Sequence, residues 1–154
     1  MDGWKLPWDG GCRCGEVRLR VTKPPMLAGA CHCTGCQAMT GSAFSLTLTV
    51  PSDGFEVVAG KPVRGGLRSG VSHHMHCPSC LSWVFTRAEG FDWFVNVRAT
   101  MLDEHGWFVP HVELWTSEKL PWARIGAARS YPRDPEMSEW PGLMEAYARD
   151  GARP

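Results

Sequence analysis

The stretch "ACHCTGC" at residues 30–36 contains three cysteines, Cys31, Cys33 and Cys36. Thiols crowded in this way can form part of a disulfide framework, or they can bind a metal ion and leave one coordination position open. The chain has seven cysteines, so internal disulfides cannot pair all of them. This odd number favours metal or redox chemistry over a disulfide framework.

The other four cysteines form two close pairs, Cys12-x-Cys14 and Cys77-x2-Cys80. A C-x2-C pair on a tight turn directs both sulfurs to one tetrahedral metal ion. A C-x-C pair in an extended chain points both side chains to one face, with Cα atoms about 6.6 Å apart. The two pairs therefore predict a closed zinc site. The three central cysteines would then hold a second zinc whose fourth position is open, as catalytic zinc ions require.

Spacing alone leaves two alternatives open. Cys36 could belong to the closed site. All seven cysteines could also be structural, or Cys31, Cys33 and Cys36 could include buried free thiols.

Short segments with alternating apolar and polar residues predict the strands that position these thiols. Val17, Leu19 and Val21 share one face of such a segment, and residues 44–50 alternate in the same way. Further candidate strands are residues 72–77, 82–85, 92–97 and 110–115. The pattern predicts a mainly β fold, an antiparallel β-sandwich or distorted barrel, forming a single zinc-binding domain over residues 1–154.

Two helical segments are expected beside these strands. Residues 140–150 begin "WPGLMEAY", with Pro141 suited to a first helical position, and predict a short C-terminal helix. A short helical turn is expected after Cys33.

The charge balance narrows the classes of partner. Sixteen basic residues match sixteen acidic ones, so we expect no nucleic-acid partner and no attachment to anionic lipid. The N-terminus does not resemble a secretory signal, and no apolar run is long enough to span a membrane. We therefore expect a cytoplasmic protein; nothing in the sequence indicates an oligomeric state.

Four segments together resemble the glutathione-dependent formaldehyde-activating enzyme family, which includes centromere protein V. They are "GGCRCGEVRLRVT", "ACHCTGCQAMTGSAF", "HMHCPSCLSWVF" and "PHVELWTSEKLPW", between about Gly10 and Trp122. The resemblance implies a mainly β fold that binds two zinc ions per chain. It assigns a structural zinc to Cys12, Cys14, Cys77 and Cys80, and a catalytic zinc to Cys31, Cys33 and Cys36.

The activity that the resemblance implies is that of a carbon–sulfur lyase. The family joins glutathione, a small-molecule thiol, to formaldehyde, a small carbonyl, and forms S-hydroxymethylglutathione. A thiol bound at the open position of the central zinc would lose its proton and become the nucleophile. The alternatives are a non-catalytic zinc-stabilised module that binds a protein partner, and a thiol redox or metal-sensing module.

The sequence departs from the family at two positions beside the cysteines. Leu81 stands where the family usually has glycine, which predicts a slightly different local backbone. Gln37 stands where many members carry a basic residue.

Other polar and aromatic residues are weaker candidates for roles at the site. The histidines are expected at the surface or beside the ligands, and His32 should point away from the metal. Trp115 and Trp122 could wall a substrate pocket. Lys61, Arg64, Arg68 and Arg98 could contact the carboxylates of glutathione, although a solvated side chain is the commoner role.

Overall fold

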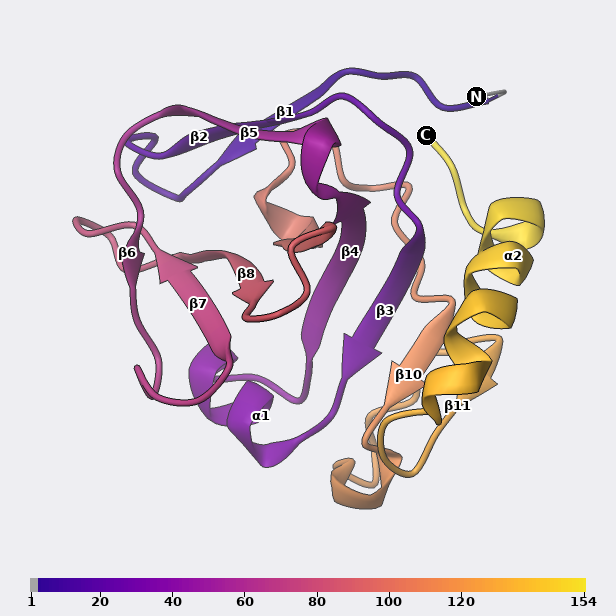
Figure 1. The fold of residues 1–154 in the computed structure, drawn as a ribbon. Helices are drawn as coiled ribbons and strands as arrows, with labels where there is room; N and C mark the ends of the chain where they lie inside the picture. The colour runs from indigo at the N-terminus through magenta and orange to yellow at the C-terminus, as the bar shows by residue number, and fades with distance from the viewer. Residues whose placement is uncertain (1–2) are drawn as a thin grey trace.

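The strands form two sheets in the computed structural model, which describes residues 3–154 (Figure 1). The smaller sheet has the strand order β1-β2-β5, and its bounds are β1 Trp8–Gly11, β2 Arg18–Val21 and β5 Phe55–Ala59. The larger sheet has the order β11-β10-β3-β4-β9-β8-β7-β6. Its bounds are β3 Leu27–Cys31, β4 Ser45–Pro51, β6 Val63–Arg64, β7 Ser72–His76, β8 Trp83–Ala88, β9 Phe94–Arg98, β10 Val112–Leu114 and β11 Arg129–Ser130.

This architecture confirms the predicted mainly β fold with a short C-terminal helix. The smaller sheet is antiparallel throughout, whereas the larger sheet is mixed because β10 pairs in parallel with both β3 and β11. Within the described residues, β11 and β6 stay unpaired edges, so the larger sheet is not a closed barrel. In Figure 1 this sheet curves, with β6 and β7 facing β3 and β10 across the molecule.

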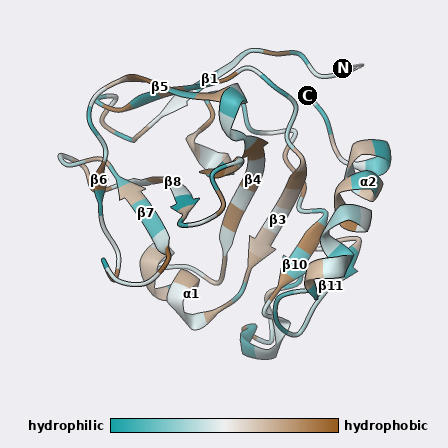
Figure 2. Cartoon of the chain, in the orientation of Figure 1, coloured by the Kyte–Doolittle hydropathy of each residue, from teal (hydrophilic) through white to brown (hydrophobic). Residues whose placement is uncertain are grey.

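The alternation in β4 divides the larger sheet into an apolar face and a polar face. Leu48 and Val50 are fully buried in the hydrophobic core together with Val95 and Val97 of β9. Residues directly opposite one another in neighbouring strands point to the same face, and so do residues two apart in one strand. The hydrophobic residues of β3, β4 and β10 appear as brown bands in Figure 2.

Two α-helices accompany the sheets. Helix α1 Thr34–Thr40 follows β3 directly, and it ends at Gly41, whose φ of 60° suits the left-handed C-cap conformation. Helix α2 Trp140–Asp150 lies along the β3 and β10 side of the larger sheet and buries Leu143 and Tyr147 (Figure 1). Both helices were predicted at these places. Short 3₁₀ turns occupy Ser52–Gly54, Ala99–Met101, Thr116–Glu118 and Met137–Glu139.

Neither helix is of the kind that crosses a lipid bilayer. Within residues 3–154, no helix has both the length and the apolar character that such a span needs.

Candidate functional site

The first candidate site is the four-cysteine cluster, which consists of Cys12, Cys14, Cys77 and Cys80. Their Sγ atoms all lie within 4.8 Å of one another. The separations are 3.5 Å between Cys12 and Cys14 and 3.7 Å between Cys14 and Cys77. Four sulfurs bound tetrahedrally at the usual zinc–sulfur length lie about 3.8 Å apart, whereas a disulfide needs about 2.05 Å. The donor set and its spacing therefore fit a closed tetrahedral metal site.

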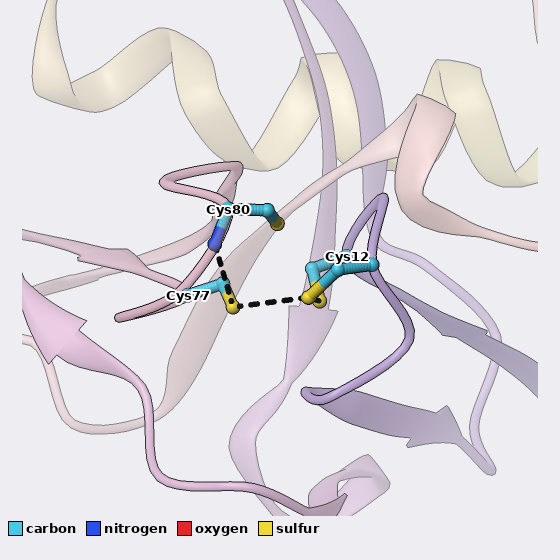
Figure 3. Close-up of side chains that lie close together, drawn as sticks. Cys12, Cys77 and Cys80 are labelled. Atoms are coloured by element: carbon cyan, nitrogen blue, oxygen red, sulfur yellow. Dashed lines mark hydrogen bonds between the residues drawn. The ribbon is translucent and has the colours of Figure 1, made fainter.

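Backbone turns on both sides aim these sulfurs at one point. Cys77 and Cys80 come from the turn between β7 and β8 and face Cys12, which follows β1 (Figure 3). The Cys80 N–H points to the Cys77 sulfur at 3.5 Å, and the Val17 N–H points to the Cys12 sulfur at 3.3 Å. Such N–H donors stabilise negative charge on sulfur.

Leu81 completes the turn after Cys80. Its φ is 61°, so the expectation of a different local backbone is wrong. Leucine here adopts the left-handed conformation that glycine would adopt without steric cost. The Leu81 N–H donates to the Cys77 carbonyl at 3.0 Å, which holds the turn closed around the sulfurs.

The second candidate site is the three-cysteine cluster, which consists of Cys31, Cys33 and Cys36. Their Sγ atoms also lie within 4.8 Å of one another, and all three side chains are partly exposed. Cys31 ends β3, Cys33 is the N-cap of α1, and the Cys36 N–H donates to the Cys33 sulfur at 3.3 Å. The structure therefore places Cys36 here and not with the four-cysteine cluster. Three thiols can bind a soft metal ion and leave a fourth position for another ligand.

The three thiols differ in acidity. A hydrogen bond from Cys31 lowers the pKa of Cys36 to about 6, and Ser45 adds a smaller contribution in the same direction. The same interaction, together with burial, raises the pKa of Cys31 well above its usual range. Without a metal ion, Cys36 is thus the thiol that carries negative charge most readily.

A buried polar network lies behind the three-cysteine cluster. His32 is fully buried, and its Nε2 donates to the Glu113 carboxylate at 2.8 Å. Ser130 donates to the other Glu113 oxygen at 2.6 Å, and the Lys119 ammonium lies 3.8 Å away. Burial opposes ionisation of Glu113, but the hydrogen bonds from Ser130 and His32 outweigh it and lower the pKa. The network joins the end of β3 to β10 and β11.

Gln37 has a defined role in holding the loop that carries the cysteines. Its side-chain amide donates to the His32 carbonyl at 2.7 Å and to the Glu118 carbonyl at 3.0 Å. The Glu118 carboxylate in turn accepts a hydrogen bond from the Thr34 N–H at 2.7 Å. The segment at Thr116–Glu118 is thereby fastened to the start of α1.

The remaining histidines and tryptophans that we considered do not join either cluster. His74 lies in β7 and shares a hydrogen bond of 2.9 Å with Thr86. His111 packs against Tyr147. Trp115 donates to Asp134 at 3.2 Å, and Trp122 is 71% exposed. The Glu113 network was not predicted from the sequence, although Glu113 stands between Val112 and Leu114 in a strand and glutamate is an unusual residue to bury.

Comparison with known proteins identifies a family, a similar protein and a solved structure with partial likeness. A family model described as "Glutathione-dependent formaldehyde-activating enzyme" matches residues 7–118. A protein of Podospora anserina that carries the same family name is 27% identical over an alignment of 154 positions that covers 89% of this chain and 71% of that protein. A crystal structure of a Rhodobacter sphaeroides protein has a TM-score of 0.47 and 21% identity, and it covers 62% of this chain and 87% of that one.

Proposed function

The chain belongs to the glutathione-dependent formaldehyde-activating enzyme family, and on this premise we propose that it is a zinc-dependent enzyme that joins a small thiol to a small carbonyl. The observation that supports the proposal is the three-cysteine cluster, in which three close sulfurs lack a fourth cysteine. We assign two zinc ions to each chain, a structural ion at the four-cysteine cluster and a catalytic ion at the three-cysteine cluster. Glutathione and formaldehyde are the proposed substrates.

The chain's own residues prepare the site for a thiol ligand. Cys31, Cys33 and Cys36 would hold the ion at three positions, and the partial exposure of all three leaves the cluster open to a small molecule. Zinc bound there would act as a Lewis acid that keeps an added thiol deprotonated at neutral pH. The Gln37 hydrogen bonds and the His32–Glu113 pair keep the three sulfurs in place.

The bond changes in the proposed reaction need no oxidant or reductant. The thiolate sulfur forms a bond to the carbonyl carbon of formaldehyde, and the electron pair of the carbonyl π bond moves to oxygen. That oxygen takes up the proton that the thiol released, which gives the S-hydroxymethyl adduct. The reverse sequence breaks the carbon–sulfur bond, as in a lyase. Holding the two reactants together supplies the main kinetic advantage.

We also propose that the protein works in the reducing environment of the cytoplasm. All seven cysteines are free thiols, and their grouping serves metal binding only while they stay reduced.

Metal analysis of two serine variants tests the assignment of ions. The wild-type protein should hold about two zinc ions per chain. Cys33→Ser should lose one ion and remain folded, whereas Cys80→Ser should lose one ion and become much less stable, because a closed site contributes to folding. A wild-type protein with one ion, or a Cys33→Ser variant that keeps two, would contradict the proposal.

Ligand binding and turnover test the chemistry. Cobalt(II) in place of zinc should change its absorption spectrum when glutathione is added, because a fourth sulfur joins the ion. S-methylglutathione, which has no thiol, should leave the spectrum unchanged. Formation of the formaldehyde adduct, followed by NMR, should be faster with the enzyme than without it. An unchanged rate despite glutathione binding would show that the physiological carbonyl or thiol is a different one.

A further inference from the structure

Arg98, the last residue of β9, is a buried cation without a carboxylate partner. Its exposure is 7%, and among residues 3–154 no carboxylate lies within ion-pair distance of it. Within the described part of the chain, its Nε has no hydrogen-bond partner, and its Nη2 makes a long contact of 3.4 Å to the Asn96 carbonyl. The expectation of a solvated arginine is therefore wrong. Burial of a charge of this kind is strongly unfavourable unless an anion compensates it.

The strand register places Arg98 on the same face of the larger sheet as the three-cysteine cluster. Cys31 of β3 lies opposite Ser45 of β4, and Arg98 lies opposite Thr47 of β4. Ser45 and Thr47 are two residues apart, so all four side chains leave the sheet on one side. Arg98 and Cys31 thus flank β4 from its two neighbouring strands.

Packing restricts the guanidinium on this face. Its carbon lies 4.1 Å from the centre of the Trp83 ring, which is a close cation–π contact. Trp83 is in turn fixed because its Nε1 donates to the Thr86 hydroxyl at 3.0 Å. The charge of Arg98 is therefore held by a rigid neighbour and does not move freely into solvent.

The charge interactions of Arg98 involve the cysteines. Burial lowers the pKa of Arg98 to about 10, and the charges of Cys36 and Cys31 oppose this shift. Arginine stays protonated at neutral pH even so. The guanidinium also contributes to the lowered pKa of Cys36, behind the larger effect of the hydrogen bond from Cys31.

Two other basic side chains close to this region do not supply the same charge. Burial lowers the pKa of His74 to about 4, so its imidazole is neutral at pH 7. The Lys119 ammonium lies 3.8 Å from Glu113 and balances that carboxylate. The charge of Arg98, in contrast, acts on Cys36 and Cys31 themselves.

We propose that Arg98 is a positioning residue whose buried guanidinium balances the negative charge of the three-cysteine cluster and so favours a thiolate over water as the fourth ligand of its metal ion. This inference rests on the proposed function. Three thiolates around a divalent ion leave one net negative charge, and a fourth thiolate adds a second. Without a nearby cation, that second charge would favour dissociation of the substrate thiol.

The test compares variants at Arg98 in the cobalt-loaded protein. Arg98→Met and Arg98→Gln both remove the charge, and the two new side chains differ in how they pack against Trp83. Arg98→Lys keeps the charge. Arg87→Met is the matched control, because Arg87 also packs over aromatic rings, 5.7 Å from Phe55 and 5.9 Å from Phe85. Retention of the ion at the four-cysteine cluster shows that each variant is folded.

Two quantities are measured. The first is the affinity of the three-cysteine cluster for cobalt, from competition with a chelator. The second is the affinity for glutathione, taken as the concentration that produces half of the change in the cobalt absorption spectrum. Both charge-removing variants should weaken each affinity by about tenfold or more, the usual effect of losing a residue that supports metal ligands. Arg98→Lys and Arg87→Met should stay within about threefold of the wild type on the same scale. Unchanged affinities in Arg98→Met and Arg98→Gln, or a loss in Arg98→Lys as large as theirs, would overturn the proposal.

The chelator measurement separates this inference from the proposed function. If glutathione leaves the wild-type spectrum unchanged, the proposed thiol chemistry fails. The affinity for the ion alone still shows whether Arg98 balances the cluster's charge.

Discussion

Replacing Glu113 by alanine should destabilise the protein strongly, because it breaks the polar network behind the three-cysteine cluster. The carboxylate is 7% exposed and accepts hydrogen bonds from Ser130 at 2.6 Å and from His32 at 2.8 Å. His32 is fully buried and its Nδ1 already lacks a partner, so Glu113→Ala leaves both ring nitrogens without one. A buried donor or acceptor that is left unsatisfied costs about 1–3 kcal/mol, and we expect a loss of at least this size.

Glu113→Gln keeps the shape of the side chain and should cost less. The glutamine oxygen can accept from His32, and its amide group can donate to the Ser130 hydroxyl once that hydroxyl turns. The substitution removes the negative charge of residue 113. In the wild type, this charge strengthens both hydrogen bonds and attracts the Lys119 ammonium, which lies 3.8 Å away. We expect a loss of about 1–2 kcal/mol from the difference between charged and neutral hydrogen bonds.

Equilibrium unfolding in urea at pH 7, with metal retained, measures both losses as changes in the free energy of unfolding. Glu145→Ala on α2 is the control: its side chain is exposed, and surface replacements usually stay within about 0.5 kcal/mol. A loss below about 1 kcal/mol for Glu113→Ala would refute the reasoning, because an unsatisfied buried histidine cannot cost so little. Equal losses for alanine and glutamine would show that the hydrogen-bonding shape of residue 113 is unimportant.

Three further outcomes follow from the same contacts. Leu81→Gly should raise the free energy of unfolding by roughly 1 kcal/mol in thermal melts, because it relieves a left-handed leucine that is 69% exposed and buries little; a loss of stability would contradict this. Gln37→Leu removes two hydrogen bonds to carbonyls, so a chelator should extract the central ion at lower concentration while the circular dichroism spectrum stays that of the wild type. The pKa of Glu113 is lowered in the folded protein, so its carboxylate stabilises the fold at pH values above the unfolded pKa of about 4.3. This stabilisation is lost as the pH falls through the folded pKa. The difference in stability between the wild type and Glu113→Gln should therefore shrink in acid.

The sequence predicts those elements whose side chains alternate. β2, β7 and β10 fall within segments predicted as strands, and β4, β8 and β9 begin in such segments and extend one to three residues beyond them. Helix α2 coincides with residues 140–150. β3 went unrecognised although it carries Cys31, because its sequence "LAGAC" contains small residues with no polar alternation. The parallel pairing of β10 with β3 could not be predicted either, since it joins residues more than 80 positions apart that share no local pattern.

Cysteine spacing predicts that the sulfurs within each close group come together, because each group is short and its geometry is mostly local. It does not decide which groups share an ion, since Cys14 and Cys77 are 63 residues apart. The supporting residues are different. His32 and Glu113 are separated by 81 residues, and the sequence around each of them does not predict their contact. In the sequence, Arg98 has the features of a surface arginine at the end of a strand, whereas in the structure it is buried and packs against Trp83.

The register of β4 links the hydrophobic core to the position of Arg98. Ser45, Thr47 and Thr49 alternate with Leu46, Leu48 and Val50, so the apolar residues fix which face of β4 joins the core. A slip of one residue against β9 would turn Arg98 toward that core and away from the cysteines, at the cost of exposing Val97. The hydrophobic pattern that stabilises the sheet therefore also keeps the Arg98 cation on the same side as the metal-binding thiols. The charge balance of the three-cysteine cluster thus depends on the hydrophobic core.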